Sequence, residues 1–121
     1  MNPYLFFWYN SSQGLVLFRQ DQLIKAYKVL YKTLDNDYDQ RAIALNKRLL
    51  GRICEMSGDY PRAIEWFLES LHIFEQCHLP KSVAVNQKFL GSHFLITGNF
   101  AEALHYYRAA ESCFVHYRDS D

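Results

Sequence analysis

The sequence predicts an all-α protein built as a stack of three helix–turn–helix repeats with about six helices. Three observations predict this fold. One segment recurs later in the chain, small residues keep their spacing in each copy, and apolar residues recur at helical intervals. Self-similarity at a period of about 40 residues is typical of helical repeat proteins. We expect one domain over residues 1–121, with repeats at approximately 5–37, 39–78 and 81–118.

The repetition is clearest around two turns. SGDYPRAIEWF begins at Ser57, and TGNFAEALHYY begins at Thr97. Upstream of them, ALNKRLLG ends at Gly51 and AVNQKFLG ends at Gly91, so the glycine recurs with the same period as the turn. An alanine follows the glycine at the same distance in both copies. Small residues, turn residues and aromatic residues therefore recur in phase.

A fainter copy precedes these two. Gly14 and Ala26 are separated by the same distance as Gly51 and Ala63. This copy lacks the Gly-Asp turn and has the residues RQDQL in its place. We therefore expect a degenerate first repeat, which also consists of two helices.

Each copy is expected to form two helices joined by a tight turn. Gly58 can adopt the left-handed conformation that ends a helix, Asp59 can cap the next helix, and Pro61 suits its first turn. Cys54 aligns with Phe94 of the next copy, which is a packing position. The expected helices are Leu5–Phe18, Gln22–Leu34, Asp39–Met56, Tyr60–Cys77, Lys81–Ile96 and Phe100–Tyr117.

Two glycines lie in the middle of expected helices. Gly51 and Gly91 each cost their helix about 1 kcal/mol relative to alanine. Close approach of the partner helix offsets this cost, because no side chain separates the two backbones. We expect Phe67 and Tyr107 to fill the space between successive helix pairs.

This pattern resembles the tetratricopeptide repeat, most strongly over residues 44–74 and 84–114. The resemblance implies a right-handed superhelix with a concave groove that binds peptides or partner helices. The periods, about 40 residues between the clear copies and about 37 residues to the faint one, exceed the basic period of about 34 residues. Either the helices or the linker Glu75–Ser82 must therefore be longer. This long form is similar to repeats of bacterial regulators and signalling proteins.

The resemblance also implies that the first helix of each pair lines the groove. Two asparagines at matching positions would reach a peptide backbone. Three basic residues would make the groove locally basic, and two interpretations remain open: a clamp for an acidic side chain or terminal carboxylate, or a solvated helix face. The candidate binding residues are Asn46, Arg48, Arg52, Asn86, Lys88, Phe89 and Ser92.

Both ends of the expected stack carry apolar residues, with no polar capping helix. Such a patch usually marks an interaction surface. The candidate end interface is Phe7, Trp8, Phe114 and Tyr117. Three explanations stay open: a piece of a longer solenoid, a homodimer formed end to end, or a partner that covers the ends.

Composition excludes several classes of protein. The 13 basic and 13 acidic residues give zero net charge, which argues against nucleic acid and anionic membranes as partners. Three cysteines without a Cys-x-x-Cys pair favour a reducing compartment. The opening YLFFWY lacks the features of a signal peptide, and no apolar run is long enough to span a bilayer. We expect a soluble cytoplasmic protein.

No motif for catalysis, a metal or a cofactor appears in the sequence. We therefore expect no enzymatic activity and no cofactor. The expected function is a protein–protein interaction module. The alternative is a sensory or regulatory segment of a larger bacterial transcription regulator or signalling protein, which requires a further domain outside this sequence.

Overall fold

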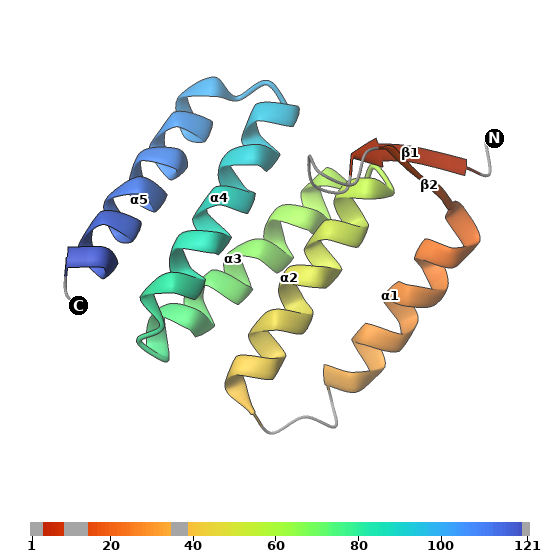
Figure 1. Ribbon diagram of the computed structural model, residues 1–121. Coiled ribbons are helices and arrows are strands. Elements are labelled where there is room, and N and C mark those ends of the chain that lie inside the picture. The colour runs from red at the N-terminus through yellow and green to blue at the C-terminus, as the bar shows by residue number, and fades with distance from the viewer. Residues whose placement is uncertain (1–3, 9–14, 35–38, 120–121) are drawn as a thin grey trace.

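In a computed structural model of the protein, the described residues are 4–8, 15–34 and 39–119. They form a two-stranded sheet followed by helices that lie side by side across the molecule (Figure 1). The strands are β1 (Tyr4–Trp8) and β2 (Leu15–Arg19), and the helices are α1 (Gln20–Leu34), α2 (Gln40–Met56), α3 (Tyr60–Gln76), α4 (Pro80–Ile96) and α5 (Phe100–Asp119).

The expected first helix, Leu5–Phe18, is wrong. β1 and β2 pair antiparallel, with Tyr4 opposite Arg19 and Trp8 opposite Leu15. Both strands are rich in aromatic and aliphatic residues, which favour extended backbone. The part of the chain that the structure describes therefore contains five helices rather than six. Gly14, which we matched to Gly51, lies outside the described residues.

α1 stands where the second helix of a first repeat was expected. Its Ala26 is exposed, whereas the matching Ala63 and Ala103 are only 0% and 3% exposed. The reason is that a first helix packs against each of the two buried alanines, and a hairpin precedes α1 instead. The stack thus consists of one single helix and two complete pairs, α2–α3 and α4–α5 (Figure 1).

The remaining helix boundaries agree closely with expectation. α2, α3 and α4 contain 17 residues each, and only a short turn separates each helix from the next. The extra length of the long period therefore lies in the helices. The segment Glu75–Ser82 is not a long linker, because α3 extends to Gln76 and α4 begins at Pro80.

The turns that join α2 to α3, α3 to α4 and α4 to α5 share one geometry. Gly58 and Gly98 have φ of 84° and 82°, as expected for left-handed residues that end a helix. The turn between α3 and α4 places His78 in the same role, with φ of 56°. The predicted cap is also confirmed, since the Asp59 carboxylate accepts a hydrogen bond from the backbone N–H of Arg62 at 3.3 Å.

Close packing within each pair explains the mid-helix glycines. A Cβ atom on Gly51 would lie 2.8 Å from the ring of Phe67, and one on Gly91 would lie 3.0 Å from the ring of Tyr107. A methyl group therefore cannot be added at Gly51 without moving the neighbouring helix. The main buried cluster is formed by α2, α3 and α4 and consists of Ala44, Cys54, Ala63, Phe67, Leu71, Phe74, Val83 and Leu90.

Candidate interaction surface

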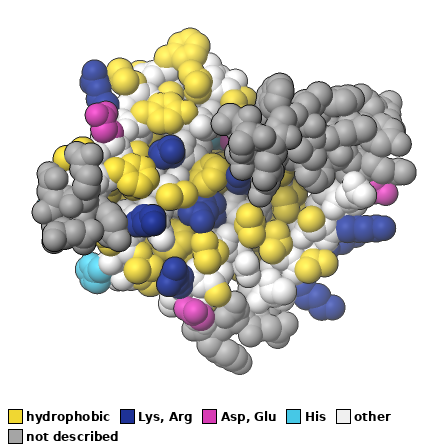
Figure 2. All heavy atoms as spheres, viewed as in Figure 1, with side chains coloured by type: hydrophobic (Ala, Val, Ile, Leu, Met, Phe, Trp, Pro, Cys, Tyr) yellow, Lys and Arg dark blue, Asp and Glu magenta, His cyan; other side chains and the backbone are white. Residues whose placement is uncertain are grey.

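Five of the seven side chains expected to line a groove fall on one face of α2 and α4: Arg48, Arg52, Lys88, Phe89 and Ser92. Leu45, Leu49 and Val85 join them, because on each helix these positions follow the spacing i, i+3, i+4 and i+7. Figure 2 shows Lys and Arg side chains set among hydrophobic ones over the region of α2 to α4. We call this surface the α2–α4 face, and it consists of Leu45, Arg48, Leu49, Arg52, Val85, Lys88, Phe89 and Ser92.

The two helices meet through basic and aromatic side chains. The guanidinium carbon of Arg52 lies 4.8 Å from the ring centroid of Phe89, and that of Arg48 lies 5.6 Å from it. These distances suit cation–π attraction. Phe89 in turn stacks on the fully buried Phe67, with 6.1 Å between ring centroids. The half-buried Phe89 therefore anchors both arginines to the core.

The positively charged side chain of Arg48 is half-buried. Its Nη1 donates a hydrogen bond to Asn86 Oδ1 at 3.0 Å, and its guanidinium carbon lies 5.6 Å from the Phe74 ring. Burial lowers the pKa of Arg48, and the neighbouring charge of Arg52 lowers it further. Among the described residues, no carboxylate forms an ion pair with Arg48. The face thus presents a partly desolvated cation that is paired with no carboxylate of the described residues.

Asn86 does not lie where a peptide could reach it. Its side chain is fully buried, and Nδ2 donates to Ser70 Oγ at 2.8 Å while Oδ1 accepts from Arg48. The expectation that Asn86 contacts a peptide backbone is therefore corrected, because its amide bonds within the helix stack. The matching Asn46 is half-buried and donates to Thr33 Oγ1 on α1 at 3.3 Å.

Two other candidates on α4 have different surroundings, because one is exposed to solvent and one contacts α5. Lys88 is exposed, and its Nζ lies 5.9 Å from the ring centroid of Phe114. Ser92 is half-buried, and its Oγ lies 2.9 Å from the hydroxyl of Tyr107, within hydrogen-bond distance. Phe114, expected at the end interface, is half-buried with its ring against Lys88.

Three other residues were expected at the end interface. The side chains of Phe7, Trp8 and Tyr117 lie outside what the structure describes. The end interface stays a prediction for these positions.

Sequence reasoning missed a hydrogen-bonded serine beneath the face. Ser70 is fully buried on α3, and its Oγ donates to the carbonyl oxygen of Ala44 on α2 at 2.6 Å. The signal was available, because Ser70 falls on the same side of α3 as Phe67 and Phe74. A polar residue within an apolar stripe is usually hydrogen-bonded.

A buried acid–histidine pair was also missed. His93 Nδ1 lies 3.0 Å from Glu55 Oε2, and the two side chains are only 4% and 18% exposed. Burial raises the pKa of Glu55, and the hydrogen bond and charge of His93 oppose that rise. His93 occupies the position that Ile53 holds in the preceding repeat, and this replacement of an apolar residue was the signal.

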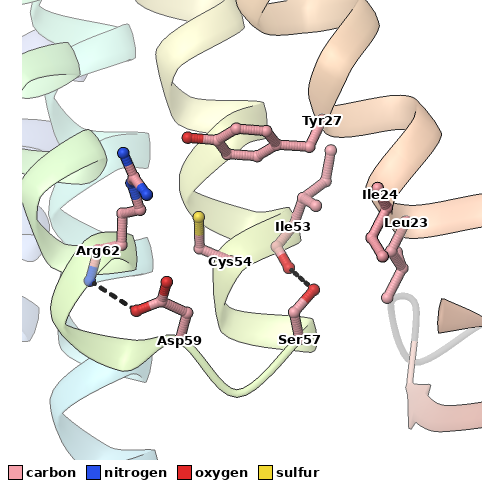
Figure 3. A pocket seen from close by; sticks show the side chains of 8 residues that line it. All are labelled: Leu23, Ile24, Tyr27, Ile53, Cys54, Ser57, Asp59 and Arg62. Atoms are coloured by element: carbon pink, nitrogen blue, oxygen red, sulfur yellow. Dashed lines mark hydrogen bonds between the residues drawn. The ribbon is translucent and has the colours of Figure 1, made fainter. Parts of the chain in front are cut away.

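A separate hollow of about 190 Å³ lies between α1 and the α2–α3 pair (Figure 3). Cys54 is one of the residues at its wall, and burial raises the pKa of its thiol to about 11. The thiol is therefore a poor nucleophile at neutral pH. The described residues contain no group of three or more His, Cys, Asp and Glu that could hold a metal ion. None of the described helices is both long and apolar enough to cross a membrane.

Comparison with known families identifies the repeat. A family model described as the tetratricopeptide repeat matches residues 40–114. This segment begins at the first residue of α2 and ends within α5, so it contains the whole α2–α4 face. Searches of curated proteins and of solved structures give no match.

Proposed function

The chain belongs to the tetratricopeptide repeat family, and we propose that its α2–α4 face binds an acidic segment of a partner protein. Membership of this family indicates a protein–protein interaction module built on a non-catalytic fold. The face, the class of partner and the residues that contact it are our proposal. Charge, exposure and contacts on the α2–α4 face support it.

The charge of Arg48, which no described carboxylate pairs with, carries the proposal. Arg52 and Lys88 add two cations to the same face, and the chain as a whole has zero net charge. The basic character of the face is therefore local. A carboxylate that approaches Arg48 would meet a guanidinium that has already lost part of its water, so the attraction exceeds that of an exposed ion pair.

Apolar side chains next to the arginines define the partner further. Leu45 and Leu49 lie one turn apart on α2 and are 36% and 46% exposed. They share the face with Arg48 and Arg52 by helical spacing. A partner segment that alternates acidic and apolar residues would bury these leucines and pair with the arginines.

Selection of ligands from a random peptide display library tests the proposal. The wild-type protein should enrich peptides that contain Asp or Glu together with Leu, Ile or Phe. A variant with both Arg48→Glu and Arg52→Glu should lose them, because the face then repels acids. Arg108→Glu reverses a single arginine charge on α5, away from the face, and should bind as the wild type does. Binding should also weaken at high salt, since ions screen partly exposed charges.

Two results would contradict the proposal. One is enrichment of basic or purely apolar peptides by the wild-type protein. The other is equal retention of acidic peptides by the Arg48→Glu, Arg52→Glu variant and by the Arg108→Glu control. Circular dichroism and urea unfolding of the three proteins would establish that each variant retains its helices.

A further inference from the structure

A chain of hydrogen bonds runs from the α2–α4 face into the core and back to α2. Arg48 Nη1 donates to Asn86 Oδ1 at 3.0 Å, Asn86 Nδ2 donates to Ser70 Oγ at 2.8 Å, and Ser70 Oγ donates to the Ala44 carbonyl at 2.6 Å. Ala44 lies one helical turn before Arg48 on α2. The chain thus starts and ends on the same helix and passes through α4 and α3.

The chemistry of the donors determines the direction of this chain. The arginine guanidinium has only donors, so the Asn86 amide must turn its oxygen toward Arg48. Its NH2 group then faces Ser70, which accepts through one lone pair and donates its own hydrogen to Ala44. A flipped amide would place two donors against each other in a fully buried site. Asn86 therefore has one stable orientation.

This arrangement holds the Arg48 guanidinium from several sides. Asn86 bonds one of its nitrogens, and the rings of Phe74 and Phe89 each lie 5.6 Å from its central carbon. A guanidinium has five N–H donors, and the bond to Asn86 uses one of them. The remaining donors form no other hydrogen bond with the described residues. They are available to a carboxylate, which can accept two parallel N–H bonds.

We propose that Asn86 is a positioning residue that orients Arg48 to receive a carboxylate of the partner. This role rests on the proposed function of the α2–α4 face. Without Asn86, the long arginine side chain samples many rotamers, and a ligand must restrict that freedom when it binds. Ser70 assists by fixing the amide of Asn86.

Thr33 provides a matched control within the chain. Its hydroxyl on α1 accepts a hydrogen bond at 3.3 Å from Asn46, which holds on α2 the position that Asn86 holds on α4. This hydrogen bond does not lead to Arg48. Thr33→Val therefore removes a similar hydrogen bond between helices but leaves Arg48 anchored.

The test follows the Nε–H signal of Arg48 by 15N NMR while acetate, a simple carboxylate probe, is added. In the wild-type protein the signal should be ordered and should shift as acetate binds. In Asn86→Ala the signal should become mobile, and acetate should bind about three- to tenfold more weakly. In Thr33→Val both properties should match the wild type.

A second variant keeps the test decisive if Asn86→Ala does not fold. Asn86→Asp retains the volume and places a carboxylate beside Arg48. Arg48 should then remain ordered while acetate binding falls, because the guanidinium already has a counter-charge. Acetate affinity equal to that of the wild type in Asn86→Asp would overturn the inference.

The possible failures are distinguishable. Unchanged acetate affinity in a folded Asn86→Ala variant overturns the positioning role and leaves the proposed function intact. Absence of any acetate response at Arg48 in the wild-type protein, together with failure to select acidic peptides, overturns the proposed function and the inference that rests on it. An equal loss in Thr33→Val and Asn86→Ala would show general destabilisation, which also overturns the positioning role.

Discussion

The pairs α2–α3 and α4–α5 have nearly the same sequence pattern but different surroundings. Phe74 of α3 is fully buried, whereas the matching Phe114 of α5 is half-buried. The cause is the neighbouring helix: α4 packs on α3, and no described element packs on the matching side of α5. The comparison teaches that a repeat position specifies a helix, while its burial depends on the next element in the stack.

The sequences of α3 and α5 differ at the positions where their surroundings differ. Ser70 of α3 accepts a hydrogen bond from Asn86, and Leu71 is only 9% exposed beneath α4. α5 has Ala110 and Glu111 at these positions, and Glu111 is exposed. The hydroxyl that bonds the asparagine of the following helix is therefore missing in α5. α1 retains it as Thr33, which bonds Asn46.

The largest expected effect contrasts the two phenylalanines. Phe74→Ala should lower the free energy of unfolding by about 3–5 kcal/mol, because it leaves a cavity in the core. Phe114→Ala should lower it by less than about 2 kcal/mol, since water can fill the vacated space. Urea unfolding of both variants measures the difference. Equal losses would mean that α5 is as well covered as α3.

A smaller contrast is expected between the two mid-helix glycines. Gly51→Ala should destabilise the protein by about 1–3 kcal/mol, because the new methyl group would overlap the fully buried Phe67. Gly91→Ala should have little net effect, because the half-buried Tyr107 can shift and alanine favours a helix by about 1 kcal/mol. Thermal unfolding compares the two variants, and a larger loss for Gly91→Ala would reverse the comparison.

The Glu55–His93 pair predicts a pH dependence specific to the junction of α2 and α4. Burial raises the folded-state pKa of Glu55, so protonation of its carboxyl group stabilises the folded protein. This stabilisation is complete below the ordinary pKa of glutamate and is lost as pH rises through the raised folded-state pKa. His93→Ile copies Ile53 and removes the hydrogen bond and charge of His93, which oppose the rise, while the charge of Arg52 continues to oppose it. The pKa of Glu55 should then increase, and the loss should extend to higher pH.

Carbon-13 NMR titration of the Glu55 carboxyl group measures this shift directly. The free energy of unfolding, measured in urea across the same pH range, should change in step with the titration of Glu55. Glu55→Gln in the His93→Ile background should remove the pH dependence in that range. An unchanged or lower Glu55 pKa in His93→Ile would show that burial does not dominate the site.

The smallest effect is expected at the turns. His78 occupies the left-handed position that Gly58 and Gly98 hold in the other turns. His78→Gly should stabilise the protein by up to about 1 kcal/mol, because glycine adopts this conformation without steric cost. Gly58→Ala should destabilise it by a similar amount. Thermal unfolding tests both, and destabilisation by His78→Gly would reveal a contribution of the imidazole that the turn geometry does not show.

Parts of the candidate site could be read from the sequence. The family resemblance placed Arg48, Arg52 and Lys88 on the first helix of each pair, and residues three and four apart on a helix share a side. It also counted Asn86 among the groove residues, but Asn86 and Lys88 are two residues apart and lie on different sides of α4. Asn86 is buried and Lys88 is exposed because of the way α4 packs on α3, and the local pattern does not determine that packing.

The sequence by itself determined the helix pairs from α2 to α5, because Gly58, Asp59 and Pro61 act on the backbone locally. Only the tertiary structure decided what each pair encloses. The hydrogen bonds of Asn86, the half-burial of Phe114 and the β1–β2 hairpin all depend on segments that meet in space. Packing and hydrogen bonding act between such segments, so a pattern within one helix cannot specify them.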